Sequence, residues 1–201
     1  MKEIAEHVLD IVQNSIFAGA KAIEVLICED RDQDLLTVEV IDDGCGMSPE
    51  LAASVLDPFV STRKKRTGLG LPLLSQTAHQ TGGEMTIDSE LGVGTTVRAV
   101  LKNSHIDRPP LGSIVDSMVL SITDGADLVF THQARFCGEA KTLAAFDTRA
   151  IRPELGDVPI THVDVILWVR GFLEEQYRET TIEGVTDHEV VGRTEENPRE
   201  G

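Results

Sequence analysis

Three Gly-x-Gly steps constrain how this chain can fold. They are Gly44-Cys45-Gly46, Gly68-Leu69-Gly70 and Gly92-Val93-Gly94. Each step borders a segment with apolar periodicity, so each is expected in a tight connection between regular elements. Because glycine has no Cβ, a flat ligand or a phosphate can approach the main chain closely at such steps. Any one step taken alone is equally typical of an ordinary turn.

The apolar periodicity predicts alternating helices and strands in residues 1–102. Helices are expected at residues 4–17, from a start at Ser48-Pro49-Glu50, and at residues 71–80. Strands are expected at residues 23–27, 35–41, 85–88 and 95–101. Helices interspersed with a few strands favour a two-layer α/β sandwich.

Charge and composition exclude several classes of protein. The 201 residues carry 18 Lys and Arg against 34 Asp and Glu, a net charge of -16. This balance argues against nucleic-acid and anionic-membrane surfaces, because phosphate contacts need basic side chains. No apolar run approaches the roughly 18 residues of a membrane helix, and the N-terminus, Met1-Lys2-Glu3-Ile4, lacks the long apolar core of a signal peptide. The three cysteines have no paired spacing, which argues against a disulfide framework or zinc site and favours the cytoplasm.

The composition divides the chain into three regions. Residues 1–102 are rich in periodic apolar residues, residues 103–183 are expected to form a smaller α+β region, and residues 184–201 are expected to be a flexible tail. The break between the first two regions is placed at Asp107-Arg108-Pro109-Pro110, because neither proline suits a helix or a central strand.

The second region is predicted to begin with a hairpin around Asp124-Gly125, with strands at residues 117–122 and 128–132. A further strand is expected at residues 142–146. Thr161 is expected to cap a helix at residues 162–178, which would bury Ile166, Val169 and Leu173. Trp168 and Phe172 are expected in the core, where aromatic side chains are usually found.

The first predicted helix carries a narrow polar stripe of His7, Asp10 and Asn14. At about 100° per residue these side chains fall within about 60° of one another, opposite an apolar face. An asparagine one turn from an aspartate can share a hydrated cation, because magnesium favours oxygen ligands. The alternative is a solvated helix face. His7 is expected to be exposed or to support the stripe from behind.

Asp42 follows the end of the predicted strand at residues 35–41 and stands two residues before Gly44. A carboxylate at this position could accept a hydrogen bond from the exocyclic amine of a purine, and Met47 could flank the ring. A simple tight turn explains the same residues.

A basic cluster, Arg63-Lys64-Lys65-Arg66, holds four of the nine basic residues of the first region. A polyphosphate would attract it through charge-assisted hydrogen bonds, and Gly68 and Gly70 precede a helix whose N-terminal N–H groups can bind phosphate. A solvated basic loop is the alternative. The chain has neither a P-loop string nor a dinucleotide-binding fingerprint.

Taken in order, these motifs resemble the ATP-binding domain shared by histidine kinases, DNA gyrase, MutL and the heat-shock chaperone ATPases, the GHKL or Bergerat family. The resemblance covers about residues 1–102. It is carried by residues 9–20, 42–47, 57–59, 67–71 and 92–96. It implies a mixed, mostly antiparallel sheet with helices on one face, and ATP with Mg2+ as ligands.

The resemblance also implies roles for individual residues. Asn14 would coordinate magnesium, and Asp42 would bind adenine with Thr95 or Thr96, the doublet leaving that choice open. Asp10 stands where hydrolytic relatives and anti-sigma-factor serine kinases carry a glutamate general base. Its shorter side chain puts hydrolysis in doubt, because a base must reach its proton. The other implied ATP-binding residues are Gly44, Gly46, Met47, Lys64, Lys65, Thr67, Gly68, Leu69 and Gly70.

Three functions are compatible with this resemblance. The first is a kinase acting on a partner or a nucleotide-dependent regulator, the second a slow ATPase that assists assembly of a partner, and the third an inactive nucleotide-binding module. Only about three residues precede the first predicted helix, so no phosphoacceptor helix pair is expected before it. Residues 105–112 and 146–157 resemble the tail of small stand-alone bacterial members, which are often encoded near iron hydrogenase subunits. The partner and the oligomeric state are left open, and DNA is disfavoured by the net charge.

Overall fold

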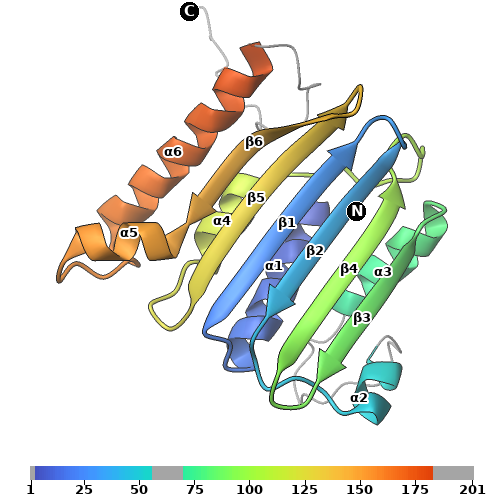
Figure 1. Cartoon of the computed structure of the whole chain (residues 1–201), viewed down its shortest axis with the longest axis horizontal. Coiled ribbons are helices and arrows are strands. Elements are labelled where there is room, and N and C mark those ends of the chain that lie inside the picture. The colour runs from blue at the N-terminus through green and yellow to red at the C-terminus, as the bar shows by residue number, and fades with distance from the viewer. Residues whose placement is uncertain (1–2, 56–69, 183–201) are drawn as a thin grey trace, which may run out of the picture.

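The computed structural model describes residues 3–55 and 70–182, which form a sheet with helices on one face (Figure 1). The first region contains α1 (Ile4–Phe17), β1 (Ala22–Asp30), β2 (Leu35–Asp42), α2 (Pro49–Ser54), α3 (Gly70–Gln80), β3 (Glu84–Glu90) and β4 (Gly94–Lys102). The second contains α4 (Ile114–Ser121), β5 (Asp127–Phe136), β6 (Glu139–Asp147), α5 (Thr148–Leu155) and α6 (Val163–Ile182).

The six strands lie in the order β3-β4-β2-β1-β5-β6. β1 and β5 are parallel, and the other neighbouring strands are antiparallel. α1, α3 and α4 cover one face of this sheet, and α6 runs beside the edge strand β6 (Figure 1). The expected two-layer sandwich with a mixed, mostly antiparallel sheet is therefore confirmed.

Alternation along the strands explains why one face is buried. Apolar side chains at every second position point toward the helices, as period-two strands require. The buried set includes Val25 and Ile27 of β1, Val38 and Val40 of β2, and Val97, Ala99 and Leu101 of β4. The start of α2 also follows the prediction, because the Ser48 hydroxyl accepts a hydrogen bond from the Leu51 N–H at 3.3 Å.

The second region continues the same sheet and core. The first N–H groups of α1 donate to this region, Ile4 to the Pro110 carbonyl at 3.0 Å and Ala5 to the Leu111 carbonyl at 2.8 Å. Ser117 of α4 donates its hydroxyl to the Ala5 carbonyl at 2.8 Å. β5 then pairs with β1 along its whole length. Strands from both sides of the predicted boundary at residues 102 and 103 therefore form one continuous sheet.

The predicted strand at residues 117–122 is wrong. These residues belong to α4, whose N-terminus is capped by Ser113, and most of its apolar side chains are buried. A short apolar run buried on most sides has no periodicity that separates a helix from a strand. Asp124-Gly125 is accordingly not the turn of a strand hairpin but lies in the turn between α4 and β5.

The predicted helix at residues 162–178 is present as α6, with Val169 and Leu173 buried and Ile166 half-buried. Core positions for Trp168 and Phe172 are wrong, because these side chains are 54% and 39% exposed. Val165, Val169, Leu173 and Tyr177 form the stripe that meets the core, and the two aromatic rings lie outside it. Thr161 lies before the helix, and its hydroxyl donates to Asp124.

A polar triad of buried His132 and Tyr177 with half-buried Glu29 joins α6 to the sheet. The His132 ring lies between the Tyr177 hydroxyl, 2.8 Å from Nδ1, and Glu29 Oε1, 3.1 Å from Nε2. Burial alone would raise the pKa of Glu29, but its hydrogen bond and charge interaction with His132 outweigh burial and lower it. Burial, and secondarily the charge of Glu29, raises the pKa of Tyr177.

This triad predicts a stability profile that falls at both ends of the pH range. A lowered Glu29 pKa stabilises the fold above its ordinary value of 4.5, and this contribution is lost as the pH falls further. A raised Tyr177 pKa stabilises the fold below the ordinary value of 10.0 and is lost as the pH rises beyond it. Urea unfolding across pH should show both limbs, with the alkaline limb reduced in Tyr177→Phe and the acid limb reduced in Glu29→Gln. The exposed Glu24→Gln on the same strand is the matched control; equal acid limbs in both variants would contradict the assignment.

Among the described residues, the helices include none that is both long enough and apolar enough to cross a membrane.

Candidate functional site

The end of α1 and the ends of β2, β3 and β4 converge on one loop, residues 43–47. The Cys45 N–H donates to the Ala18 carbonyl just after α1, at 2.9 Å. The Cys45 carbonyl accepts the Gly92 N–H of the β3–β4 turn, also at 2.9 Å. Backbone hydrogen bonds therefore hold two of the three Gly-x-Gly steps together.

Asp42, the last residue of β2, has a fixed carboxylate. Its Oδ2 accepts the Ser15 hydroxyl at 2.6 Å, and its Oδ1 accepts the Gly44 N–H at 2.9 Å. Ser15 is buried on α1. Each carboxylate oxygen can accept about two hydrogen bonds, so the carboxylate keeps acceptor capacity in a defined orientation.

The strand register distinguishes Thr95 from Thr96. Thr95 is paired with Asp42 and Thr96 with Ile41. Directly paired residues share a face, so Thr95 lies with Asp42 on the helix-covered face and Thr96 lies on the other. The Thr95 hydroxyl is 2.8 Å from the Ser89 hydroxyl of β3, which accepts the Met47 N–H at 2.9 Å. Ser89 therefore links Thr95 to the Met47 loop.

Gly46 and Gly94 lie so close to neighbouring main-chain atoms that a side chain would not fit at either position. A Cβ on Gly46 would lie 1.9 Å from the Glu90 carbonyl oxygen, and one on Gly94 would lie 2.0 Å from the Asp42 carbonyl oxygen. Both residues have positive φ, 63° and 144°. A side chain on Gly46 would push the 43–47 loop away from β3, and one on Gly94 would push β4 away from β2.

The polar stripe of α1 meets the start of α3. A Cβ on Gly70 would lie 2.8 Å from Asp10 Cβ, so the first residue of α3 lies directly against Asp10. Asp10 and Asn14 are half-buried, one turn apart. His7 is 2% exposed, so the prediction that it is exposed is wrong. Its burial agrees with the alternative, in which His7 supports the polar stripe from behind. The packing of α3 against α1 covers this part of the stripe.

The sequence comparison decides the family of this chain. The family described as histidine kinase-, DNA gyrase B-, and HSP90-like ATPase matches residues 2–105. The chain belongs to this family. Residues 2–105 therefore form a GHKL ATPase domain, in agreement with the resemblance of the motifs.

Several curated proteins similar to this GHKL chain carry kinase names. Sporulation kinase C of Bacillus subtilis is 33% identical over 99 residues, covering 49% of this chain and 23% of the relative. The sensory histidine kinase/phosphatase NtrB of Rhodobacter capsulatus is 46% identical over 57 residues, covering 28% and 16%. Histidine protein kinase SaeS of Staphylococcus epidermidis is 27% identical over 108 residues, covering 51% and 30%. The chain therefore spans less than a third of each of these kinases.

Two solved structures share part of its arrangement. The N-terminal domain of a DNA repair protein gives a TM-score of 0.46 at 14% identity, covering 73% of this chain and 53% of that one. The catalytic domain of histidine kinase ThkA gives a TM-score of 0.41 at 22% identity, covering 51% and 68%.

The described residues fit the ligands of a GHKL ATPase. Asp42 offers an oriented acceptor beside the Thr95 hydroxyl, and Gly46 and Gly94 leave the surrounding main chain without side-chain obstruction. Asn14 and Asp10 supply the oxygen atoms that magnesium prefers. The described part of the chain contains no cluster of three or more His, Cys, Asp or Glu able to hold a metal ion.

Two residues that contact the candidate site, Ser15 and Ser89, were not predicted from the sequence, and some predicted residues lie outside the described ranges. Ser15 hydrogen-bonds to Asp42, and the Ser89 hydroxyl lies 2.8 Å from the Thr95 hydroxyl. Neither serine is part of a recognisable ligand-binding motif in the sequence. Ser15 offered one signal, as a polar residue next to Asn14 on the buried side of an amphipathic helix. The predicted phosphate-binding residues outside the described ranges are Lys64, Lys65, Thr67, Gly68 and Leu69.

Proposed function

We propose that this chain binds ATP with Mg2+ between α1, α3 and the ends of β2 and β4, and acts as a kinase on a partner protein or as a nucleotide-dependent regulator. The observation that carries this proposal is the Asp42 carboxylate, held by Ser15 and Gly44 beside Thr95. In a GHKL ATPase, an acceptor fixed in this way suits the exocyclic amine of adenine.

The adenine end of the proposed site uses side chains from one face of the sheet. Asp42 accepts the exocyclic amine, and the Thr95 hydroxyl supports it from the paired position. Thr96 faces away, so the register favours Thr95 for this role. Gly44 and Gly46 let the base approach the loop, and Met47 flanks the ring with a polarizable side chain.

The phosphate end is proposed on α1 and at the start of α3. Asn14 holds the magnesium ion, and Asp10 orients the group that attacks the terminal phosphate. Bound ATP supplies a transferable γ-phosphoryl group. The proposed phosphate-binding residues are Lys64, Lys65, Thr67, Gly68, Leu69 and Gly70. Catalysis of this kind consists mainly of positioning and charge neutralisation.

A slow ATPase is the second candidate, favoured by the position of Asp10 against Gly70 at the start of α3. A carboxylate there can orient water as readily as it can orient a hydroxyl group of a partner. The family relatives carry kinase names, but this chain corresponds to a small part of them. A hydrogenase-related partner is proposed only from the resemblance of residues 105–112 and 146–157.

The magnesium role predicts that Asn14→Ala weakens ATP binding chiefly when Mg2+ is present. Removing one charge-assisted ligand contact should lower the affinity for Mg2+–ATP by about tenfold, with little change in EDTA. Titration calorimetry with and without Mg2+ measures both values. The neighbouring exposed Gln13→Ala is the matched control. Equal losses with and without Mg2+ would contradict the assignment.

The role of Asp10 predicts a separation of binding from chemistry. Asp10→Asn should bind ATP nearly as tightly as the wild type but turn over at least about 100-fold more slowly, the range that general-base groups contribute. Phosphate release and transfer from γ-labelled ATP to a partner in cell extract distinguish the ATPase from the kinase. Wild-type turnover in the variant would refute the role of Asp10. Normal binding with neither activity in the wild type would favour the inactive module.

A further inference from the structure

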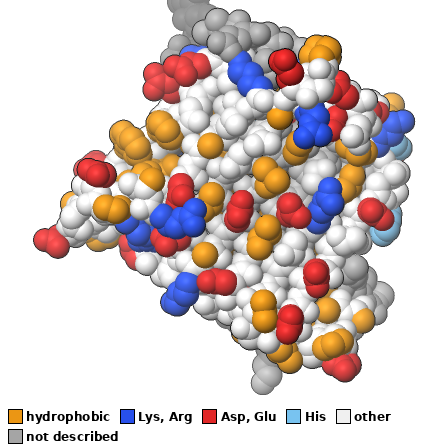
Figure 2. Space-filling view, viewed as in Figure 1, with side chains coloured by type: hydrophobic (Ala, Val, Ile, Leu, Met, Phe, Trp, Pro, Cys, Tyr) orange, Lys and Arg blue, Asp and Glu red, His pale blue; other side chains and the backbone are white. Residues whose placement is uncertain are grey.

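The face of the sheet opposite α1, α3 and α4 is open toward the viewer in Figures 1 and 2. Figure 2 shows hydrophobic side chains gathered on the part of this face beside α6 and α5, with many acidic side chains across the rest. This distribution extends well beyond the proposed nucleotide site, which uses Asp42 and Thr95 on the helix-covered face.

An apolar groove of about 410 Å³ lies on this open face. Trp168 and Phe172 of α6 line one side, where their rings stack with centroids 5.3 Å apart and an interplanar angle of 11°. The remaining lining includes Val129, Ala145 and Ile151. Exposed apolar surface of this kind marks interaction sites on soluble proteins, and tryptophan is enriched among the residues that dominate binding energy.

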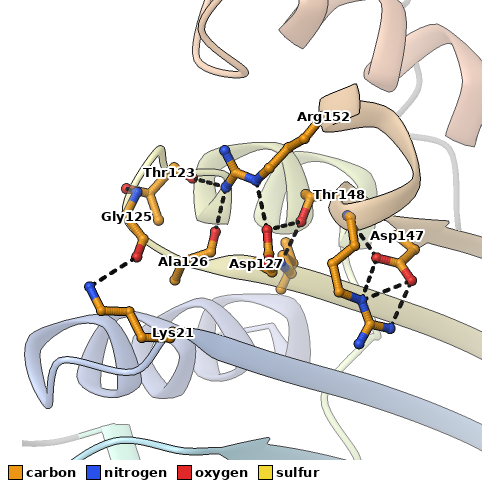
Figure 3. Close-up of polar contacts among 10 residues, drawn as sticks. Lys21, Thr123, Gly125, Ala126, Asp127, Asp147, Thr148 and Arg152 are labelled. Atoms are coloured by element: carbon orange, nitrogen blue, oxygen red, sulfur yellow. Dashed lines mark hydrogen bonds and ion pairs between the residues drawn. The ribbon is translucent and has the colours of Figure 1, made fainter. Parts of the chain in front are cut away.

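The wall of the groove formed by α5 is held in a fixed position. Arg152 donates from Nε to Asp127 at 2.6 Å, and from one Nη to the carbonyls of Thr123 and Ala126 at 2.9 Å each (Figure 3). The Thr148 hydroxyl accepts the Leu128 N–H at 2.8 Å. These contacts fasten α5 to the start of β5, so the groove is ordered before a partner arrives. Preorganisation of this kind reduces the entropic cost of binding.

An acidic hollow adjoins the apolar groove. It also measures about 410 Å³, shares Val129 with the groove and reaches the strand ends at Asp42 and Thr95. Its lining carries the carboxylates of Glu24, Asp43, Asp88 and Glu90. Among the described residues that line it, the one basic side chain is Arg149, which is paired with Asp147 at 2.8 Å. The hollow therefore keeps an excess of negative charge.

We propose that the groove and the hollow together form a docking surface for a partner protein segment in which aromatic or aliphatic side chains are followed by lysine or arginine. The apolar side chains fill the groove between α5 and α6, and the basic side chains enter the hollow beside Glu24 and Asp88. A second copy of this chain does not suit the surface, because each copy carries a net charge of -16. Because α1 and α3 lie on the other face, a docked segment leaves them uncovered.

The test uses Trp168, which is the only tryptophan of the chain and therefore reports on the groove. The probe is a labelled peptide with a Phe-Leu-Ile block followed by a Lys-Arg block, added to the full-length protein. We expect saturable binding by anisotropy and a blue shift of the tryptophan emission as the groove is filled. A peptide with Glu in place of Lys and Arg should bind at least about tenfold more weakly, as should one with Ser in place of the apolar block.

Matched variants distinguish peptide binding at this surface from non-specific electrostatic binding to an acidic protein. Phe172→Ala should weaken binding by about tenfold, whereas Leu120→Ala, 67% exposed on α4, should leave it unchanged. Asp88→Asn should weaken binding by about threefold, while Glu84→Gln on the same face of β3 should have no effect. Equal effects of Asp88→Asn and Glu84→Gln, or equal binding of all three peptides, would overturn the proposal. Concentration-dependent dimers that disappear in Phe172→Ala would also overturn it in favour of a second copy.

Discussion

The variant Asp42→Asn is expected to bind ATP about 100-fold more weakly than the wild type and to keep its fold. The asparagine amide replaces one acceptor oxygen with an NH2 donor, which would face the exocyclic amine of adenine without an acceptor. Loss of a hydrogen bond to a charged group in a shielded site costs about 2–3 kcal/mol, which corresponds to this change in affinity. Titration calorimetry gives the affinity, and circular dichroism monitors the fold.

Three further variants make this result specific to the geometry. Ser15→Ala removes the 2.6 Å hydrogen bond that orients Asp42 and should lower ATP affinity by about five- to tenfold. Thr95→Ala should also weaken binding, whereas Thr96→Ala should not, because only Thr95 shares a face with Asp42. Unchanged affinity in Asp42→Asn, or equal losses in the two threonine variants, would show that adenine lies elsewhere.

Gly94→Ala is expected to destabilise the protein by about 3 kcal/mol or more and to abolish ATP binding. A methyl group at this position would lie 2.0 Å from the Asp42 carbonyl oxygen, and φ of 144° is a conformation that alanine rarely adopts. Relief of the clash must move β4 away from β2 at the point where Thr95 faces Asp42. For a chain of this size, we expect the Tm to fall by about 6–12 °C.

Substitutions at two other glycines distinguish the steric clash at Gly94 from the cost of its backbone conformation. Gly92 also has a positive φ, 78°, but a Cβ there meets nothing within 4 Å, so Gly92→Ala should cost only about 1 kcal/mol. Gly171 lies in α6 with open space around it, and Gly171→Ala should stabilise the helix by up to about 1 kcal/mol. Thermal unfolding of the three variants should rank them in this order, and a Gly94→Ala protein as stable as Gly92→Ala would contradict the close approach of the strands.

The helices and strands of the first region were predictable because their apolar periodicity agrees with the capping residues and glycines that bound them. α1 matches its predicted bounds, and β1, β2, α3, β3 and β4 extend their predicted ranges by only a few residues. The helix α4 was not predictable in the same way, since most of its apolar residues are buried and their pattern does not separate a helix from a strand. The exposure of Trp168 and Phe172 was missed because aromatic residues are commonly buried, although α6 already had a full apolar stripe without them.

Sequence motifs indicated the residues of the candidate site but not the neighbouring side chains that orient them through hydrogen bonds. Asp42 and Asn14 stood out because their residue types and spacing carry chemical meaning. The hydroxyl group that orients Asp42 belongs to Ser15, a residue far from Asp42 in the chain. The choice between Thr95 and Thr96 needed the register of β2 against β4, which a doublet cannot reveal. The positions of Lys64 and Lys65 stay predictions, because they fall outside the described residues.

The parallel pairing of β1 with β5 has a consequence for truncation experiments. A recombinant fragment that stops at residue 105, where the family match ends, would leave β1 as an open edge and would strip α4 from α1. It would also remove the carbonyls of Pro110 and Leu111 that accept the first N–H groups of α1. Such a fragment would expose a pairing-competent edge beside bare apolar surface, the combination that leads to aggregation. Studies of nucleotide binding therefore require the chain through α6.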